Sequence, residues 1–253
     1  MNLPIASEST SFEPACLSGL SIFLPAHNEE ANLERVVRGL ARIAEQVARE
    51  YELIVVDDGS RDRTGEIARR LAQADSHVRW VSHDVNRGYG AAVRSGLSAA
   101  RMPYVMLCDG DGQFDPADVV RLVEKIADYD VVVGRRSNRA EGLVRRLNGQ
   151  LWSALMRLLF GLRIRDIDCG FKLFRGELLK HVNLRARGAM ISTELMAKLA
   201  ARGARICEVN VNHLPRLAGE PSGAKLAVIA RAFVELFALA GELRNESRKR
   251  QRS

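Results

Sequence analysis

Short runs of β-branched and apolar residues alternate with segments of helical spacing along this chain. The runs lie at 20–24, 52–57, 78–82, 104–108 and 130–134. After the first run, apolar residues repeat at the spacing of one helix face, namely Leu33, Val36, Val37, Leu40, Ile43 and Val47. A later helix is expected to start at Asp115 and Pro116, a capping side chain followed by a proline. Because strands that alternate with helices form parallel sheets covered on both faces, the sequence predicts an α/β fold, a Rossmann-like, mostly parallel sheet with helices on both faces.

Polar loops follow all five predicted strands. They lie at 25–30, 57–60, 83–88, 109–113 and 134–136, and most of them carry carboxylates or arginines. In open α/β sheets, ligands bind outside the carboxyl ends of the strands. We therefore expect the functional site where these loops meet.

Asp109 and Asp111 stand two residues apart after the fourth predicted strand. Two carboxylates with Gln113 nearby suit Mg²⁺ or Mn²⁺ bridged to a diphosphate. Gly110 and Gly112 leave room for a bulky ligand to approach the backbone. An Asp-x-Asp pair by itself is common in turns, but its position at a strand end favours a metal site.

Two other loops have alternative interpretations. Asp57 and Asp58 follow a fully apolar strand, so one carboxylate could bind a base or ribose while Ser60 or Asp62 caps the next helix. The glycines of 88–90 resemble a dinucleotide loop only superficially, because the third glycine is absent at the required spacing. A dehydrogenase is therefore disfavoured.

Positive charge is concentrated in two stretches of the chain. Lys and Arg number 38 against 31 Asp and Glu, and residues 135–165 hold eight arginines with Glu141 as the single acid. The stretch 244–253 forms a basic tail. Such patches suit anionic lipid, nucleotide or nucleic acid, or they are simply solvated. A nucleic-acid partner is not expected, because the acidic strand ends would repel a phosphate backbone.

The sequence predicts one domain over 19–243, preceded by a poorly ordered extension over 1–18 and followed by the tail 244–253. It predicts neither a signal peptide nor a transmembrane helix. The segments 142–160 and about 225–244 could lie in a membrane interface or pack on the core. Four widely spaced cysteines indicate reduced, mostly buried thiols. We expect a cytoplasmic protein with peripheral contact to the cytoplasmic face of a membrane.

The loops in this order resemble glycosyltransferase family 2, of the GT-A fold, and within it the polyprenyl-phosphate branch that is similar to dolichol-phosphate mannosyltransferases. The matching segments are 24–30, 55–64, 86–90, 109–113, 133–136 and 168–172, then Pro215 and Arg216 with Gly219, Ser222 and Lys225. Several features depart from the family pattern, among them glycine at 110 and 112, where alanine and a larger residue are more usual. His27 stands where an aromatic residue is common, and the loop from Arg216 to Lys225 is longer than usual.

The resemblance implies a role for each matching position. The base and ribose pocket would be lined by Pro25, Ala26, His27, Glu29 and Asp57, supported by Asp58, with Gly90 and Gly110 also at the donor. Asp109, Asp111 and Gln113 would hold the metal. Arg136 and Arg216 would neutralise phosphates, assisted by Lys225.

The implied reaction is an inverting, metal-dependent transfer of a sugar from GDP-mannose or a UDP-hexose to a polyprenyl phosphate at the membrane surface. Asp109, Asp111 and Arg136 would stabilise the leaving diphosphate. The alternative is a soluble family 2 enzyme with a hydroxyl acceptor, for which Glu194 or Asp168 would be the base. Each of these two acids could equally be structural.

Overall fold

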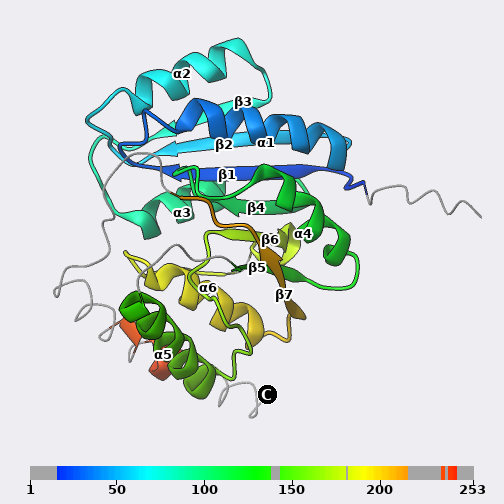
Figure 1. The fold of residues 1–253 in the computed structure, drawn as a ribbon, viewed down its shortest axis with the longest axis vertical. Coiled ribbons are helices and arrows are strands. Elements are labelled where there is room, and N and C mark those ends of the chain that lie inside the picture. Colours follow the sequence, from blue (N-terminus) through cyan, green and yellow to red (C-terminus); the bar gives the residue numbers. More distant parts are fainter. Residues whose placement is uncertain (1–15, 138–142, 181, 216–234, 237–238, 244–253) are drawn as a thin grey trace, which may run out of the picture.

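One seven-stranded sheet, in the order β3-β2-β1-β4-β6-β5-β7, runs through the molecule (Figure 1). The computed structural model describes residues 16–137, 143–180, 182–215, 235–236 and 239–243. The strands are β1 (Leu20–Ala26), β2 (Tyr51–Asp57), β3 (Val78–Ser82), β4 (Tyr104–Cys108), β5 (Val131–Arg136), β6 (Phe171–Arg175) and β7 (Ile206–Val211). The α-helices are α1 (Leu33–Val47), α2 (Thr64–Ala74), α3 (Tyr89–Ala99), α4 (Val119–Ile126), α5 (Leu143–Phe160) and α6 (Met190–Ala200), with short 3-10 helices η1 (Pro116–Asp118) and η2 (Gly176–Leu178).

The sheet is parallel except at β6, which pairs antiparallel with both β4 and β5. This confirms the expected mostly parallel sheet. All five predicted strands are present, and their ends differ from the expected bounds by no more than two residues. β6 and β7 were not predicted, because their sequences lack a long β-branched run.

Helices cover both faces of the sheet, as predicted. Along β1, Ile22 and Leu24 face a core that also contains the apolar stripes of α1, α2 and α4. Phe23 points to the other face, where α3, α5 and α6 pack. Successive side chains along a strand point to opposite faces of the sheet. A strand that is covered by helices on both sides is therefore expected to carry mostly apolar side chains on both faces. β1 and β2 are accordingly buried along their whole length.

Two expected helix starts have side-chain acceptors in place. Asp115 accepts the Ala117 backbone N–H at 3.0 Å, and Pro116 follows it at the start of η1. Asp62, not Ser60, accepts the Thr64 backbone N–H at 3.0 Å at the start of α2.

Leu17 forms an isolated parallel bridge with Ala48 and is buried, so it belongs to the core. Of the cysteines, Cys108 and Cys169 are buried.

α5 lies beside α6 (Figure 1) and packs on the core through Met156, which is buried. Leu151 and Leu158 on the same helix are 62% and 82% exposed. Within the residues described, no helix has the length and apolar character needed to span a bilayer. Most of the segment 225–244, together with the tail 244–253 and residues 1–15, lies outside them.

Candidate active site

The loops after β1 and β2 are joined by a set of hydrogen bonds at the carboxyl edge of the sheet. The Asp58 backbone N–H donates to the Ala26 carbonyl at 2.9 Å, continuing the pairing of the two strands. His27 Nδ1 lies 3.0 Å from the Asp58 carbonyl, and the ring is exposed. The Asn28 N–H donates to Ser60 Oγ at 3.0 Å. The first two predicted donor loops therefore form one continuous surface that presents His27 to solvent.

The two aspartates after β2 have different surroundings. Asp57 Oδ1 accepts the Ser60 N–H at 3.0 Å. Asp58 is buried and accepts three groups of the next loop: the Arg87 N–H at 2.9 Å, the Gly88 N–H at 2.8 Å and His83 Nδ1 at 2.6 Å. Asp58 thus fixes the loop after β3, while Asp57, which is also buried, holds the 57–60 turn.

Glu29, predicted to line the same pocket, is also buried, and its carboxylate accepts the Asn32 side-chain amide at 2.9 Å. Its backbone N–H donates to Thr64 Oγ1 at 2.8 Å. These contacts tie the start of α1 to the start of α2. Pro25 lies on the other side of the same loop, where its carbonyl accepts the Gly110 N–H at 3.2 Å.

Asp109 is held from two sides. Its backbone N–H donates to the Gly170 carbonyl at 3.0 Å, and its Oδ1 accepts the Tyr89 hydroxyl at 2.8 Å. A Cβ atom on Gly170 would lie 1.8 Å from Asp109 Oδ2. Only glycine at 170 leaves this space, so a residue of the β6 loop and a residue of α3 together define the carboxylate orientation.

The electrostatics of this group are consistent with a cation site. Burial and the nearby charge of Asp111 raise the pKa of Asp109 to about 7, although the Tyr89 hydrogen bond and the charges of Lys172 and Arg136 oppose the rise. Burial and the charge of Asp109 raise the pKa of Tyr89 well above its ordinary value, so its hydroxyl remains a donor. Two mutually repelling carboxylates are a donor set that fits a hard divalent cation.

The other two predicted metal ligands, Asp111 and Gln113, make hydrogen bonds within and beyond their own loop. Asp111 Oδ1 accepts the Gln113 backbone N–H at 3.0 Å. The Gln113 side-chain nitrogen donates to the Leu214 carbonyl at 3.3 Å, so its amide is turned towards the 213–215 segment. In the described part of the chain, no group of three or more His, Cys, Asp or Glu side chains could hold a metal. Mg²⁺ commonly binds one or two carboxylates and completes its shell with substrate phosphate, and the two aspartates fit that pattern.

Arg136 lies at the carboxyl end of β5 and forms a two-pronged ion pair. Its Nε and one terminal nitrogen each lie 2.8 Å from an oxygen of Asp166, and its backbone N–H also donates to that carboxylate at 3.1 Å. The positive charge of Arg136 also lowers the pKa of Asp109, so the guanidinium is close enough to act electrostatically on the acidic pair. The other predicted phosphate ligands, Arg216 and Lys225, lie outside the described residues.

The two candidate bases differ in burial. Glu194 is buried, and its carboxylate accepts the Arg185 N–H at 2.9 Å, the Ala186 N–H at 2.8 Å and Lys198 Nζ at 2.8 Å. Those contacts favour an anchoring role. Asp168 is exposed in the loop before β6.

Three residues near Asp109 escaped the sequence reasoning. Tyr89 and Gly170 contact Asp109 only because of the tertiary fold, and the residues next to them in the sequence do not predict these contacts. For Lys172 the sequence does contain a signal, because a charged residue inside the otherwise apolar run of β6 indicates a special role. It is fully buried, its Nζ donates to the Cys169 carbonyl, and burial lowers its pKa.

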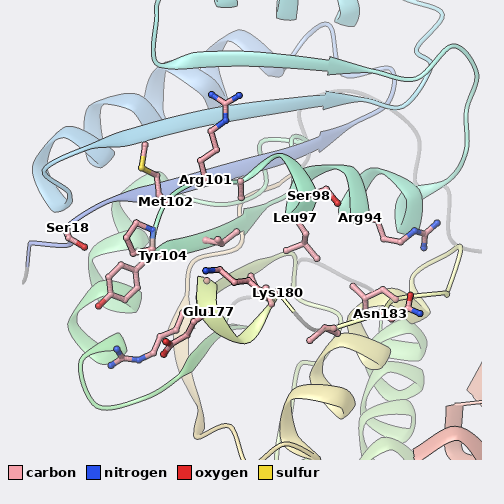
Figure 2. A pocket seen from close by; sticks show the side chains of 18 residues that line it. Ser18, Arg94, Leu97, Ser98, Arg101, Met102, Tyr104, Glu177, Lys180 and Asn183 are labelled. Carbon is pink, nitrogen blue, oxygen red and sulfur yellow. The ribbon is translucent and has the colours of Figure 1, made fainter.

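A hollow of about 770 Å³ lies at the opposite edge of the sheet (Figure 2). It is lined by residues at the amino end of β4, such as Arg101 and Tyr104, and by residues after β6, such as Glu177 and Lys180. Arg94 and Arg175, also in its lining, donate to backbone carbonyls. The hollow is therefore separate from the carboxyl edge where the acidic loops meet.

Comparison with known proteins identifies the family. Residues 21–182 match the model of a family described as Glycosyl transferase family 2. The chain belongs to glycosyltransferase family 2. The resemblance inferred from the loops is thereby confirmed, and the sheet and its helices have the GT-A fold of the structural neighbours.

Relatives of this family 2 protein include an undecaprenyl-phosphate 4-deoxy-4-formamido-L-arabinose transferase of Pseudomonas paraeruginosa. It is 30% identical over 224 residues, which cover 87% of this chain and 65% of the relative. This chain thus matches a little under two thirds of that relative's length. Glucosyl-3-phosphoglycerate synthase from Mycobacterium tuberculosis, solved with Mg²⁺ and UDP, superposes with a TM-score of 0.70 at 26% identity, covering 88% of this chain and 80% of the synthase. The same synthase has also been solved with Mn²⁺, UDP-glucose and phosphoglyceric acid.

Proposed function

We propose that this family 2 protein transfers a sugar, with inversion, from a nucleotide-sugar donor to a polyprenyl phosphate, using Mg²⁺ or Mn²⁺. The observation that carries the proposal is the meeting of Asp109 with the loops of β1 and β2 at one edge of the sheet. The Gly110 N–H donates to the Pro25 carbonyl at 3.2 Å, which joins the acidic loop to the proposed nucleotide loop. The metal and nucleotide complexes of the structural neighbour support the donor side.

The donor would lie across this edge with its base near His27 and Asp57 and its diphosphate at Asp109 and Asp111. Those two carboxylates would hold the divalent cation, which when bound neutralises the charge that develops on the leaving diphosphate. Arg136 adds a positive field from the neighbouring strand end. Gly110 and Gly90 are both buried, with Gly110 against the Pro25 carbonyl and Gly90 against the Ala186 carbonyl, so they allow neighbouring loops to pack closely beside the acidic pair.

A polyprenyl phosphate is the acceptor that this site serves most simply. A phosphate oxygen is already anionic at neutral pH, so it can form the new bond to the anomeric carbon as the bond to the nucleotide diphosphate breaks. No base is then required. The name of the curated relative, an undecaprenyl-phosphate sugar transferase, supports this acceptor class. The contacts of Glu194 also support it, because they engage the carboxylate of one of the two candidate bases.

Peripheral attachment to the cytoplasmic face of an anionic membrane follows from a lipid acceptor. The exposed Leu151 and Leu158, seven residues apart on α5, form an apolar stripe with the exposed Arg157 beside it. Leucines inserted below headgroups, with arginine at headgroup level, are typical of interfacial helices.

A second candidate is transfer to a hydroxyl group. It is favoured by the structural neighbour, a synthase that has been solved with phosphoglyceric acid. A hydroxyl acceptor needs a base, and Asp168 is the exposed one of the two candidate acids.

The test is sugar transfer in a defined mixture. The protein is incubated with Mn²⁺ or Mg²⁺, a panel of GDP- and UDP-sugars, and a short-chain polyprenyl phosphate. We expect a lipid-linked sugar from one donor, and a loss of at least about 100-fold in kcat for Asp109→Asn because a charged ligand is removed. Asp128→Asn, an exposed acid of the turn between α4 and β5, is the matched control and should retain activity.

Donor hydrolysis without lipid product would favour the hydroxyl acceptor. Absence of turnover with every donor, or an Asp109→Asn variant as active as the wild type, would overturn the proposal.

A further inference from the structure

We infer that Tyr89 is a positioning residue for Asp109, and that a loop anchored by Glu194 holds Tyr89 in place. The inference deepens the proposed function and rests on it, because Asp109 is there a metal ligand. It assigns to Tyr89, Glu194 and residues 185–187 one shared task. That task is to present the Asp109 carboxylate in a fixed orientation before the cation and donor arrive.

The carboxylate is constrained at both oxygens. Oδ1 accepts the Tyr89 hydroxyl at 2.8 Å, and Oδ2 lies so close to Gly170 that a Cβ atom there would be 1.8 Å away. Of these two contacts, the hydrogen bond from the Tyr89 hydroxyl is the directional one, so it sets the rotation of the carboxyl group. Without it, the group could turn about its Cβ–Cγ bond.

Tyr89 is itself fixed because the first turn of α3 is pressed against the 185–187 loop. The Gly90 N–H donates to the Arg187 carbonyl at 2.9 Å. A Cβ atom on Gly90 would lie 2.3 Å from the Ala186 carbonyl oxygen, so the two backbones are as close as glycine permits. One turn further along α3, an Arg94 guanidinium nitrogen donates to the same Ala186 carbonyl at 2.5 Å.

The loop in turn is held by a buried carboxylate. Glu194 accepts the Arg185 N–H at 2.9 Å and the Ala186 N–H at 2.8 Å. Lys198 Nζ pairs with the same carboxylate at 2.8 Å and also donates to the Asn183 carbonyl at 2.7 Å. A continuous set of contacts therefore runs from Glu194 through residues 185–187 and the start of α3 to the Tyr89 hydroxyl and Asp109.

A ligand that is oriented in advance binds its cation more tightly. Outer partners of metal ligands fix their geometry, and their loss typically costs about 10- to 100-fold in metal affinity or activity. Tyr89 meets this description, since its hydroxyl donates to the carboxylate that is the proposed metal ligand.

The decisive experiment is Mn²⁺ titration followed by electron paramagnetic resonance, in the presence of UDP or GDP, on the wild type and Tyr89→Phe. We expect about tenfold weaker Mn²⁺ binding in the variant, with an unchanged melting temperature because the ring is kept. The control is Tyr51→Phe, which removes a hydroxyl that donates to the Glu45 carboxylate at 3.1 Å, away from the acidic loop. It should bind Mn²⁺ as the wild type does.

Equal Mn²⁺ affinity in the wild type and Tyr89→Phe would overturn the inference and leave the proposed function standing. A wild type that binds no Mn²⁺ with either nucleotide would instead overturn the proposed metal site itself. The two failures are thus distinguishable.

Glu194→Gln supplies a second, independent readout. If Glu194 anchors the loop, the variant should weaken Mn²⁺ binding as well as turnover, and its pH–rate profile should keep its shape. If it were a base, Mn²⁺ binding would be unchanged, while kcat would fall and the limb of the profile that reports the base would disappear. That second pattern would overturn the role assigned here.

Discussion

At the scale of single residues, the acidic site is governed by spaces and hydrogen bonds that arise from distant parts of the chain. Asp109 depends on a hydroxyl twenty residues earlier and on a glycine in the loop before β6. Both contacts are made within the protein. The chemistry of the aspartate is therefore set by the protein before a ligand binds.

Gly170→Ala tests this arrangement. The added methyl group would meet the Asp109 carboxylate, so we expect the carboxylate to be displaced and kcat to fall at least about tenfold. Gly241→Ala is the matched control, because a Cβ atom there meets nothing within 4 Å. Activity of Gly170→Ala equal to that of this control would contradict the close packing of residue 170 on Asp109.

At the scale of elements, a buried acid links three strands at the amino edge of the sheet. Glu52 of β2 accepts Ser21 Oγ of β1 at 2.7 Å, an Arg79 guanidinium nitrogen of β3 at 2.6 Å and the Arg101 backbone N–H at 2.8 Å. Burial alone would raise the pKa of Glu52, but the hydrogen bonds from Ser21 and Arg79 leave it lowered. The charged form therefore stabilises the register of these strands.

We expect Glu52→Gln to reduce the free energy of unfolding by about 1–3 kcal/mol at neutral pH, since it leaves buried partners poorly satisfied. Because the folded pKa is lowered, this contribution is complete above the unfolded value of about 4.3 and is lost as the pH falls below it. Urea unfolding at several pH values measures both effects. Glu50→Gln, at an exposed residue just before the same strand, should change the free energy of unfolding little. A difference in stability between the wild type and Glu52→Gln that widens on acidification would refute the account.

At the scale of the whole molecule, the sheet separates two functions of the surface. The acidic loops occupy the carboxyl edge, while α5 covers the face shared with α3 and α6 and presents leucines outwards. An enzyme that acts on a lipid phosphate needs two surfaces: a polar site for the phosphate and an apolar surface for contact with the membrane.

Flotation with anionic liposomes tests the membrane part. Replacing Leu151 and Leu158 together by serine should weaken binding by about tenfold or more, as expected for losing two partly inserted leucines. Val85→Ser, which removes an apolar side chain that is 66% exposed elsewhere, is the control. If the double variant floats as well as the control, α5 is not the contact surface.

The sequence by itself determined the features that depend on local periodicity and local chemistry. The five parallel strands, the stripe of α1 and the capped start of η1 were predicted because strand alternation, helix spacing and capping act within a few residues. The position of Asp109 and Asp111 at a strand end followed from the same pattern.

Only the tertiary structure decided which side chains meet. The antiparallel insertion of β6 brings Gly170 against Asp109 and buries Lys172 beside it, and nothing in the local sequence of β6 encodes its neighbours. Glu194, a candidate base from its sequence position, is drawn into contacts with Ala186 and Lys198 by the packing of its own helix and loop. Pairing and close approach are properties of the whole sheet, which no short stretch of residues specifies.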